Sequence, residues 1–403
     1  MKPNARICGL AGALMSLGAL AWLCATAAAA EAAVTTTPGS EPSLQIPLES
    51  QELAEPLETF NLRFSSVTAP FAKEPDLGRH RIVRGALGFG GPTNNFTRFL
   101  WDQTANRLYL DLNDNQDLTD DPEAPFPGEY DGYLQLFPRL KLSLESPSGR
   151  HSYLVDLRLG GSNPGQLQGT CAMRSIWQGR LELGGRAYQV GLAENPLATT
   201  AAGEAHYFLF RPWDARNEPI RLNPGTPHLV SWSPKIFIAR QAFSVAANYK
   251  NEAGVPRYLL TLTPTQPPLG QLRASGQFLY RLVLQDPVGY SAILDSPVEE
   301  GSLPAGNYRT AEVWLRHGTA EAFYIGPLSL IVRANESVSL VAGGPLTNTV
   351  TAQGRGVELA LTYRLTGQRG LDYRMTSEDR TNPPSWRILA NDKELASGKF
   401  AYG

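Results

Sequence analysis

The densest group of possible metal ligands in the sequence lies between residues 111 and 123. In the stretch DLNDNQDLTDDPE, nine side chains end in a carboxylate or an amide, and seven of them are candidate ligands: Asp111, Asn113, Asn115, Asp117, Asp120, Asp121 and Glu123. No lysine or arginine occurs between Arg107 and Arg139, so no neighbour in the sequence balances these charges. Crowded carboxylates repel one another, and a divalent cation removes that cost. The stretch therefore predicts a cation site, most simply for calcium.

The spacing of these oxygens supports calcium over other metals. Calcium takes six to eight oxygen ligands. A tight turn directs alternate side chains towards one point, and Asp111, Asn113, Asn115 and Asp117 have this alternate spacing. We expect the apolar Leu118 to dock the loop onto a core. Gln116 stands where the usual loop needs glycine, and Pro122 stands where it needs a closing glutamate, so one of the last three carboxylates would close the site. The alternative is a loop without an ion, held by Asx-turns.

The pattern resembles the EF-hand-like D-x-[DN]-x-[DN] calcium loops of secreted bacterial proteins, such as dockerin-type repeats. Together with the C-terminal stretches GGPLTNTV, LTGQRGLDYR and LASGKFAYG, it also resembles large uncharacterised secreted proteins of planctomycete- and verrucomicrobia-like bacteria. This resemblance implies an exported, β-rich protein in which calcium has a structural role. It implies no activity.

Other catalytic signatures do not occur in the sequence. The five histidines have no zinc-binding spacing, although a zinc site built from distant histidines stays open: His80, His151, His206, His228 and His317. No nucleophile elbow occurs, and the glycine-rich residues 85–92 do not lead into a helix that could bind phosphate. The sequence thus indicates a structural or binding protein and names no catalytic residue. Two alternatives remain: a module that binds extracellular polysaccharide, and a hydrolase whose active-site residues are dispersed along the chain.

Two tryptophans bear on the polysaccharide alternative. Trp213 and Trp232 lie near proline-marked turns, where an exposed indole would offer a flat surface to a sugar ring. We expect both to pack in the core, which is the commoner role of a tryptophan.

The N-terminus has the features of a signal peptide over residues 1–30. Lys2 and Arg6 precede an apolar run from residue 7 to 23, and Ala28, Ala29 and Ala30 form a cleavage site. A lipoprotein anchored at Cys24 is less consistent with Leu23 before it, and an uncleaved anchor is a further alternative. We expect a periplasmic or extracellular protein, with no membrane span after the signal is removed. The mature chain would keep one cysteine, Cys171, and so would form no internal disulfide.

Composition and hydrophobic alternation indicate the fold class. The 403 residues include 38 glycines and 31 prolines, scattered between short alternating runs, and the net charge of −2 gives no basic surface for a nucleic-acid partner. We expect an all-β protein of two or three domains with antiparallel sheets and β-sandwich modules in its C-terminal half. Gly184-Gly185 predicts a hairpin, and only residues 240–254 are compatible with a helix.

The expected organisation follows from changes in pattern and from proline-rich boundaries. After the signal comes a flexible linker over residues 31–57, followed by a β-rich domain over 58–270 that carries the acidic loop. The motif LPAGNY near residue 303 resembles a turn of bacterial prealbumin-like modules, which implies a β-sandwich over residues 271–335. A C-terminal β-sandwich module is expected over residues 336–403.

Overall fold

A computed structural model describes most of the chain after residue 41. The described ranges are 42–57, 59–66, 70–88, 96–121, 124–146, 149–161, 164–194, 205–220, 226–252, 255–297, 301–355, 358–376 and 384–400. The expected signal peptide lies outside them. No helix within these ranges is long and apolar enough to cross a membrane.

The described structure is built from β-strands, which confirms the predicted fold class. Its sheets are antiparallel except where β16 pairs with β21 and β19 pairs with β25. The predicted hairpin forms at Gly184 and Gly185, both of which have positive φ angles, between β12 (Ser175–Leu183) and β13 (Arg186–Glu194). The helix-compatible stretch is the strand β17 (Gln241–Glu252). Its pairing with β18 along its whole length outweighs a weak local preference.

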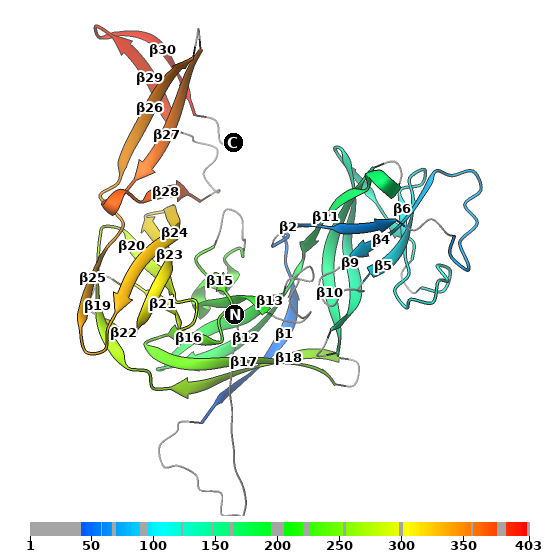
Figure 1. Ribbon diagram of the computed structural model, residues 1–403, viewed down its shortest axis with the longest axis horizontal. Helices are drawn as coiled ribbons and strands as arrows, with labels where there is room; N and C mark the ends of the chain where they lie inside the picture. The colour runs from blue at the N-terminus through cyan, green and yellow to red at the C-terminus, as the bar shows by residue number, and fades with distance from the viewer. Residues whose placement is uncertain are drawn as a thin grey trace, which may run out of the picture. The chain divides into compact units, whose positions relative to one another are not determined.

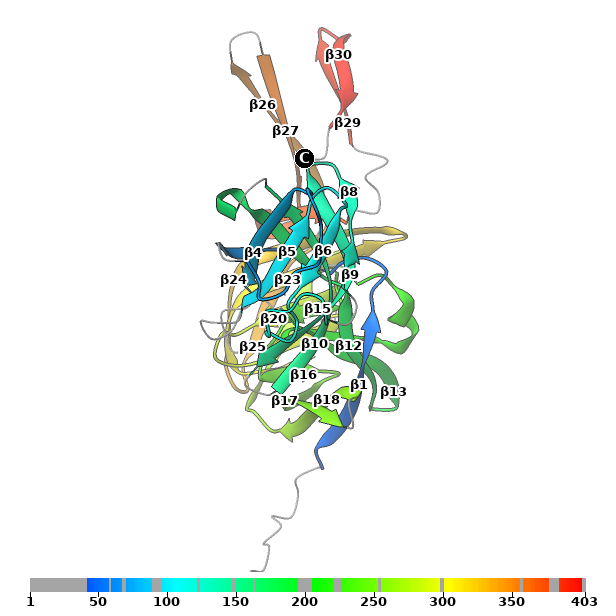
Figure 2. The same ribbon diagram turned by 90° about the vertical axis from the view of Figure 1, so that its right-hand side faces the viewer.

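Two five-stranded sheets contain most of the strands before residue 174 (Figures 1 and 2). One contains, in order, β3 (Arg63–Ser66), β4 (Ile82–Gly88), β5 (Phe96–Asp102), β6 (Arg107–Leu110) and β7 (Phe126–Pro127). The other contains, in order, β2 (Thr59–Asn61), β11 (Gln168–Met173), β10 (Gly149–Gly160), β9 (Leu134–Ser146) and β8 (Glu129–Asp131).

These two sheets bury one apolar core between them. Leu87 and Phe99 from the first sheet share a core cluster with Leu157 from the second. Trp101 meets Phe137 edge to face, with 6.4 Å between ring centroids. Alternating strands that bury one face each produce such a two-layer arrangement.

A longer series of paired strands forms the rest of the main framework (Figure 1). In pairing order it contains β15 (Leu229–Ser231), β14 (Ala205–Pro212), β13, β12, β1 (Leu44–Glu52), β18 (Val255–Thr265), β17, β16 (Lys235–Ile238), β21 (Ser291–Asp295), β20 (Leu279–Gln285), β23 (Gly306–His317), β24 (Ala320–Val332), β28 (Asp372–Met375), β27 (Glu358–Thr366) and β26 (Thr347–Arg355).

Smaller elements complete the described structure. They are the sheet of β22 (Gly301–Pro304), β19 (Leu269–Ser275) and β25 (Ser337–Val341), the hairpin of β29 (Ser385–Ala390) and β30 (Lys393–Lys399), and the short 3-10 helices η1 (Pro164–Gln166), η2 (Trp213–Asn217) and η3 (Gln368–Gly370). The three-stranded sheet shares a core cluster with β20, β21, β23 and β24, as two layers of a β-sandwich do.

The prediction of a flexible linker through residue 57 is wrong for residues 44–52. They form β1, which pairs with β12 on one side and with β18 on the other. Ile46 and Leu48 are buried in a core cluster. The stretch LQIPLESQE has few apolar residues, so its burial depends on the two partner strands rather than on a strong pattern of its own.

Strand pairs also cross the two expected domain boundaries. β16 pairs with β21 across residue 270, and β24 pairs with β28 across residue 335. At both positions, strands on the two sides of the expected boundary therefore belong to the same paired series.

Candidate functional site

The acidic loop connects two paired strands. β6 ends at Leu110, and β7 begins at Phe126 and pairs with β6 through Leu108. The loop begins at Asp111, whose backbone N–H donates to the carbonyl of Arg98 at 2.9 Å. The loop thus joins two neighbouring strands of one sheet.

Two of the predicted ligands, Asp111 and Asp121, are buried side chains with 3% and 6% exposure. The carboxylate of Asp111 accepts backbone N–H groups from Asn115 at 3.1 Å and from Gln116 at 3.2 Å. Asp121 Oδ1 accepts the backbone N–H of Leu112 at 3.0 Å. The first and last described residues of the loop thus direct their carboxylates inward and hold its backbone.

The other predicted ligands lie nearer the surface. Asn113 and Asn115 both donate their side-chain amides to Asp120, at 3.3 and 2.8 Å. The side-chain oxygen of Asn113 accepts the backbone N–H of Asn115, and that of Asn115 accepts the N–H of Asp117, at 3.1 and 2.7 Å. These last two contacts are Asx-turns, which any version of the loop would use, with or without an ion.

The counter-charge missing from the local sequence comes from Lys73. Its ammonium lies 3.0 Å from Asp117 Oδ2, and the two backbones form a parallel bridge. The Lys73 backbone also donates to the carbonyl of Gln116 and accepts from the N–H of Leu118. Sequence reasoning missed this partner because it lies 44 positions away and its segment has no pattern that marks it.

The loop backbone follows the expected turn despite its departures from the template. Gln116 adopts a left-handed conformation, with φ of +64°, where glycine is usual. For a residue with a side chain this costs about 1–2 kcal/mol. Leu118 is 2% exposed and packs with Phe71, Leu100 and Tyr109. The predicted docking of Leu118 onto a core is therefore confirmed.

The loop contains one buried oxygen atom without a hydrogen-bond partner. Asp121 Oδ2 is inaccessible to solvent, and no group among the described residues donates to it. Such an atom favours a cation or a water molecule at that position. No cluster of three or more His, Cys, Asp or Glu side chains within the described ranges is arranged to hold a metal. Pro122 and Glu123 lie outside those ranges, and a calcium shell also takes amide, backbone and water oxygens.

Burial sets the ionisation of the two inner carboxylates. Desolvation raises the pKa of Asp111, and the nearby charge of Asp114 adds to it. Desolvation also raises the pKa of Asp121, helped by the charges of Asp111 and Asp120. By contrast, hydrogen bonds from Thr119, together with Lys73, lower the pKa of the exposed Asp117. Asp111 and Asp121 thus form the part of the loop with unbalanced negative charge.

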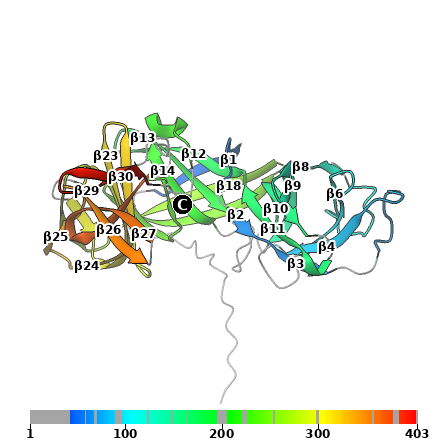
Figure 3. The ribbon, with the colours of Figure 1, turned by 90° about the horizontal axis from the view of Figure 1, so that it is seen from above.

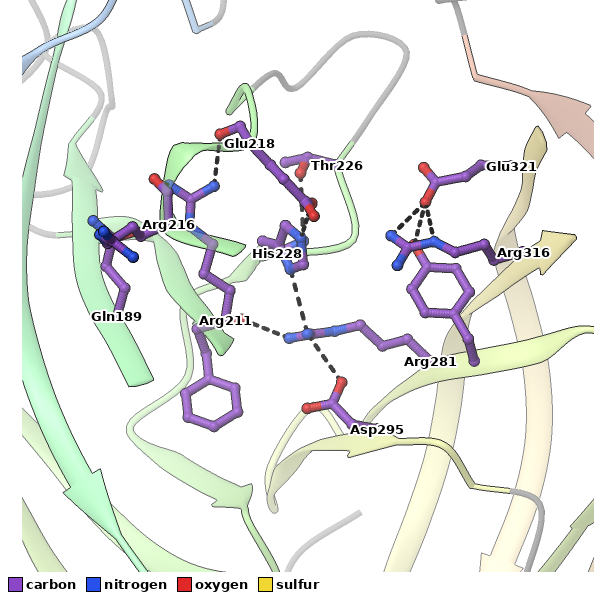
Figure 4. A network of polar contacts seen from close by, with 12 residues as sticks. Gln189, Arg211, Arg216, Glu218, Thr226, His228, Arg281, Asp295, Arg316 and Glu321 are labelled. Atoms are coloured by element: carbon purple, nitrogen blue, oxygen red, sulfur yellow. Dashed lines mark hydrogen bonds and ion pairs between the residues drawn. The ribbon is translucent and has the colours of Figure 1, made fainter. Parts of the chain in front are cut away.

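A second polar group, the arginine network, is centred on Arg281 of β20 (Figure 4). Arg281 is 1% exposed and donates to the carbonyl of Phe210 at 2.7 Å, to Asp295 at 3.0 Å and to His228 Nδ1 at 3.4 Å. Since Nδ1 accepts, His228 Nε2 carries the proton and donates to Glu218 at 2.8 Å. Desolvation lowers the pKa of His228, which keeps the ring neutral.

A second buried arginine extends this network towards β13. Arg211 is 2% exposed and donates to Gln189 at 2.7 Å and to the carbonyl of Glu218 at 2.7 Å. Both nitrogens of His228 are already engaged, so neither is free to accept a proton from a substrate. The arrangement ties β14 and the segment after η2 to β20, which is a structural task.

A third buried group surrounds Glu194 at the end of β13. Its carboxylate accepts the indole N–H of Trp177 at 3.0 Å and the hydroxyl of Tyr258, and it lies 3.3 Å from His151 Nδ1. His151 stacks on Tyr249 with 3.7 Å between ring centroids. Among the described side chains, three histidines have a carboxylate partner: His80 with Asp102, His151 with Glu194 and His228 with Glu218.

The two tryptophans named from the sequence do not form a free aromatic surface. Trp232 packs against a core cluster. The guanidinium groups of Arg180 and Arg216 lie over the ring of Trp213, at 5.1 and 5.3 Å from its centre. Cys171 is buried, as expected of a small apolar side chain.

Comparison with protein-family models, with curated proteins and with solved structures finds no match to this chain.

Proposed function

We propose that the protein is an exported structural or binding protein in which a calcium ion stabilises the connection between β6 and β7. The observation that supports this proposal best is the buried Oδ2 of Asp121, which has no donor among the described residues. Burial raises the pKa of Asp121, and the charge of the nearby Asp111 carboxylate raises it further. A divalent cation would remove the repulsion and give the orphaned oxygen a partner.

Asp111 and Asp121 would hold the ion from the inside of the loop. The remaining oxygens would come from the exposed part of the loop, that is from Asn113, Asn115, Asp117 and Asp120, with Glu123 as a further ligand. Calcium would supply charge neutralisation and no chemistry on a substrate. Its effect would be to hold the loop against the Lys73 segment and the small core around Leu118. Export is supported by the signal features of residues 1–30.

Thermal unfolding tests the calcium proposal directly. Binding to the native state alone raises the free energy of unfolding by RT ln(1 + [L]/Kd), or about 2.7 kcal/mol at a free calcium concentration of 100 Kd. We expect the wild-type protein to melt at a higher temperature in millimolar calcium than in chelator. The Asp121→Asn variant should lose most of this increment, because the neutral amide removes the negative charge that attracts the ion to the buried position.

Asp114→Asn is the matched control for this experiment. Asp114 lies in the same loop, and Asp114→Asn removes one negative charge, as Asp121→Asn does. The Asp114 side chain forms no hydrogen bond among the described residues. It should keep the calcium increment. Equal melting temperatures in chelator and in calcium for the wild-type protein would contradict the proposal, as would an increment that survives in Asp121→Asn.

The calcium increment should also grow with pH. The raised pKa values of Asp111 and Asp121 mean that the folded, ion-free protein holds these protons more tightly than the unfolded chain does. Stability from this source is present at low pH and is lost as the two groups ionise. Calcium competes with those protons, so the increment should be larger at pH 7.5 than at pH 4.5. A constant increment across this range would place the ion elsewhere.

A further inference from the structure

Figure 3 shows the strands β2, β11, β10, β9 and β8 from above. A groove of about 630 Å³ lies beside the sheet that they form. Three segments line it. They are residues 61, 62 and 64 near β2 and β3, residues 131–134 at the β8–β9 turn, and residues 167–170 at the start of β11. Its volume falls in the range of small-ligand sites, about 300–1,000 Å³. None of these residues belongs to the acidic loop.

A glycine at the end of β10 lies next to two residues that line the groove. Gly160 pairs with Gln168 of β11, and a Cβ on Gly160 would lie 2.5 Å from Leu134 Cδ2. Gly160 thus has no side chain that would displace Leu134, which lines the groove together with Gln168.

The aromatic ring of Tyr133 stands at the edge of this groove. Tyr133 is 99% exposed, although tyrosine usually buries much of its ring. It follows Gly132, whose φ of +64° sets a two-residue hairpin turn between Asp131 and Leu134. A tight turn of this kind fixes the backbone at Tyr133, so the ring emerges at a defined position beside the groove.

The polar groups that line the groove are mostly uncharged. Asn61, Gln168 and Thr170 have side chains that form no hydrogen bond within the described part of the chain. The only charged residue in the lining is Asp131, and Arg158 pairs with it at 2.9 Å. Free amides and a hydroxyl suit a ligand rich in hydroxyl groups. An anionic ligand would meet the Asp131 carboxylate.

We propose that this groove binds a neutral polysaccharide chain, with one sugar ring stacked on Tyr133. The axial C–H groups of a pyranose ring form an apolar face that complements the negative face of an aromatic ring. The hydroxyl groups at the edge of the sugar would bond to Asn61, Gln168 and Thr170. This inference names the kind of partner that the proposed binding role would have, but it rests on a separate site from the calcium loop.

Affinity electrophoresis in native gels tests the proposal. The probes are soluble neutral polymers, namely hydroxyethylcellulose, galactomannan, laminarin and soluble starch, with a titration calorimetry measurement on the matching hexasaccharide. We expect at least one polymer to retard the full-length mature protein. Tyr133→Ala should weaken binding at least tenfold, whereas Tyr133→Phe should keep it within about threefold because the ring remains.

Tyr130→Ala is the matched control. Tyr130 lies on β8 in the same hairpin and is 77% exposed, but it does not line the groove. It should bind within twofold of the wild-type protein. Because Tyr133 is fully exposed, its variants should melt as the wild-type protein does, which separates loss of binding from loss of folding.

Three results would overturn the inference. They are the absence of retardation by every neutral polymer, retardation only by an acidic polymer such as alginate, and equal binding by Tyr133→Ala and the wild type. The experiment is repeated in chelator to keep the two proposals apart. Polysaccharide binding could persist in chelator while calcium leaves the melting temperature unchanged. This result would refute the calcium proposal and still support the groove proposal.

Discussion

The acidic loop and the arginine network handle buried charge in opposite ways. The loop buries two carboxylates close together and satisfies them mainly with backbone N–H groups from residues no more than nine positions away. The network buries two arginine side chains, and two of the acceptors of Arg281 lie 53 and 71 positions away. The loop keeps an orphaned carboxylate oxygen, whereas every terminal nitrogen of Arg281 named above has an acceptor.

This difference separates a place that favours a ligand from one that stabilises the fold. Backbone N–H groups offer only partial positive charge, so the loop still has unbalanced negative charge that a cation could remove. In the network, the guanidinium groups and the neutral histidine form hydrogen bonds and ion pairs with one another and with carboxylates. Only Arg281 Nε lacks an acceptor among the described residues, and a single nitrogen of that kind is easily bonded by a buried water.

The largest effect should come from breaking the arginine network. Arg281→Met keeps an unbranched apolar side chain but leaves the Phe210 carbonyl and His228 Nδ1 without a donor. The free energy of unfolding should fall by about 1–3 kcal/mol for each buried acceptor left unpaired. Urea denaturation followed by tryptophan fluorescence measures this change.

Arg309→Met is the comparison variant for that measurement. Arg309 lies on β23 and is exposed, so its replacement should change stability by about 0.5 kcal/mol or less. Equal losses in the two variants would mean that the buried contacts of Arg281 add nothing beyond those of a surface arginine.

An intermediate effect should appear when the network is titrated with acid. The pKa of His228 is lowered in the folded protein, chiefly by burial, with Arg281 and Arg211 opposing its protonation and Glu218 favouring it. Below the unfolded value of about 6.5 the unfolded chain binds the proton first. Stability is therefore complete above pH 6.5 and should fall on acidification by up to about 1.4 kcal/mol per pH unit.

His228→Asn should flatten this acid dependence even if it lowers stability at neutral pH. His317→Asn serves as its control, because His317 is exposed and contacts only the ring of Phe278 among the groups described. The quantity to compare is the slope of the free energy of unfolding between pH 5.5 and 7.5. A slope in His228→Asn that matches the wild type would assign the acid sensitivity to another group.

The smallest effect should come from the ion pair of the acidic loop. Lys73 is 62% exposed, and solvent screens its contact with Asp117. In chelator, Lys73→Met should shift the melting temperature less than Asp121→Asn does. In calcium the same variant should bind the ion more tightly, because Asp117 would no longer be neutralised. Weaker calcium binding by Lys73→Met would show that the lysine orients the loop rather than competing with the ion.

Local pattern predicted much of the architecture, and its failures have a common cause. Alternation correctly indicated β-structure, and Gly184-Gly185 correctly indicated a hairpin, because both signals depend on residues that are adjacent in the sequence. The linker prediction was wrong at β1, and residues 240–254 gave an ambiguous signal. In both cases partner strands distant in the sequence decide the structure.

The sequence by itself determined the all-β class and the place where acidic side chains gather, since both follow from the order of residue types along a few turns of chain. It also determined that Leu118 would anchor the loop. Only the tertiary structure decided that Lys73 forms an ion pair with Asp117, that Asp121 has an unpaired oxygen, and that Tyr133 is exposed beside a groove. These features depend on which distant strands lie side by side, and burial and hydrogen bonding across such contacts leave no local pattern in the sequence.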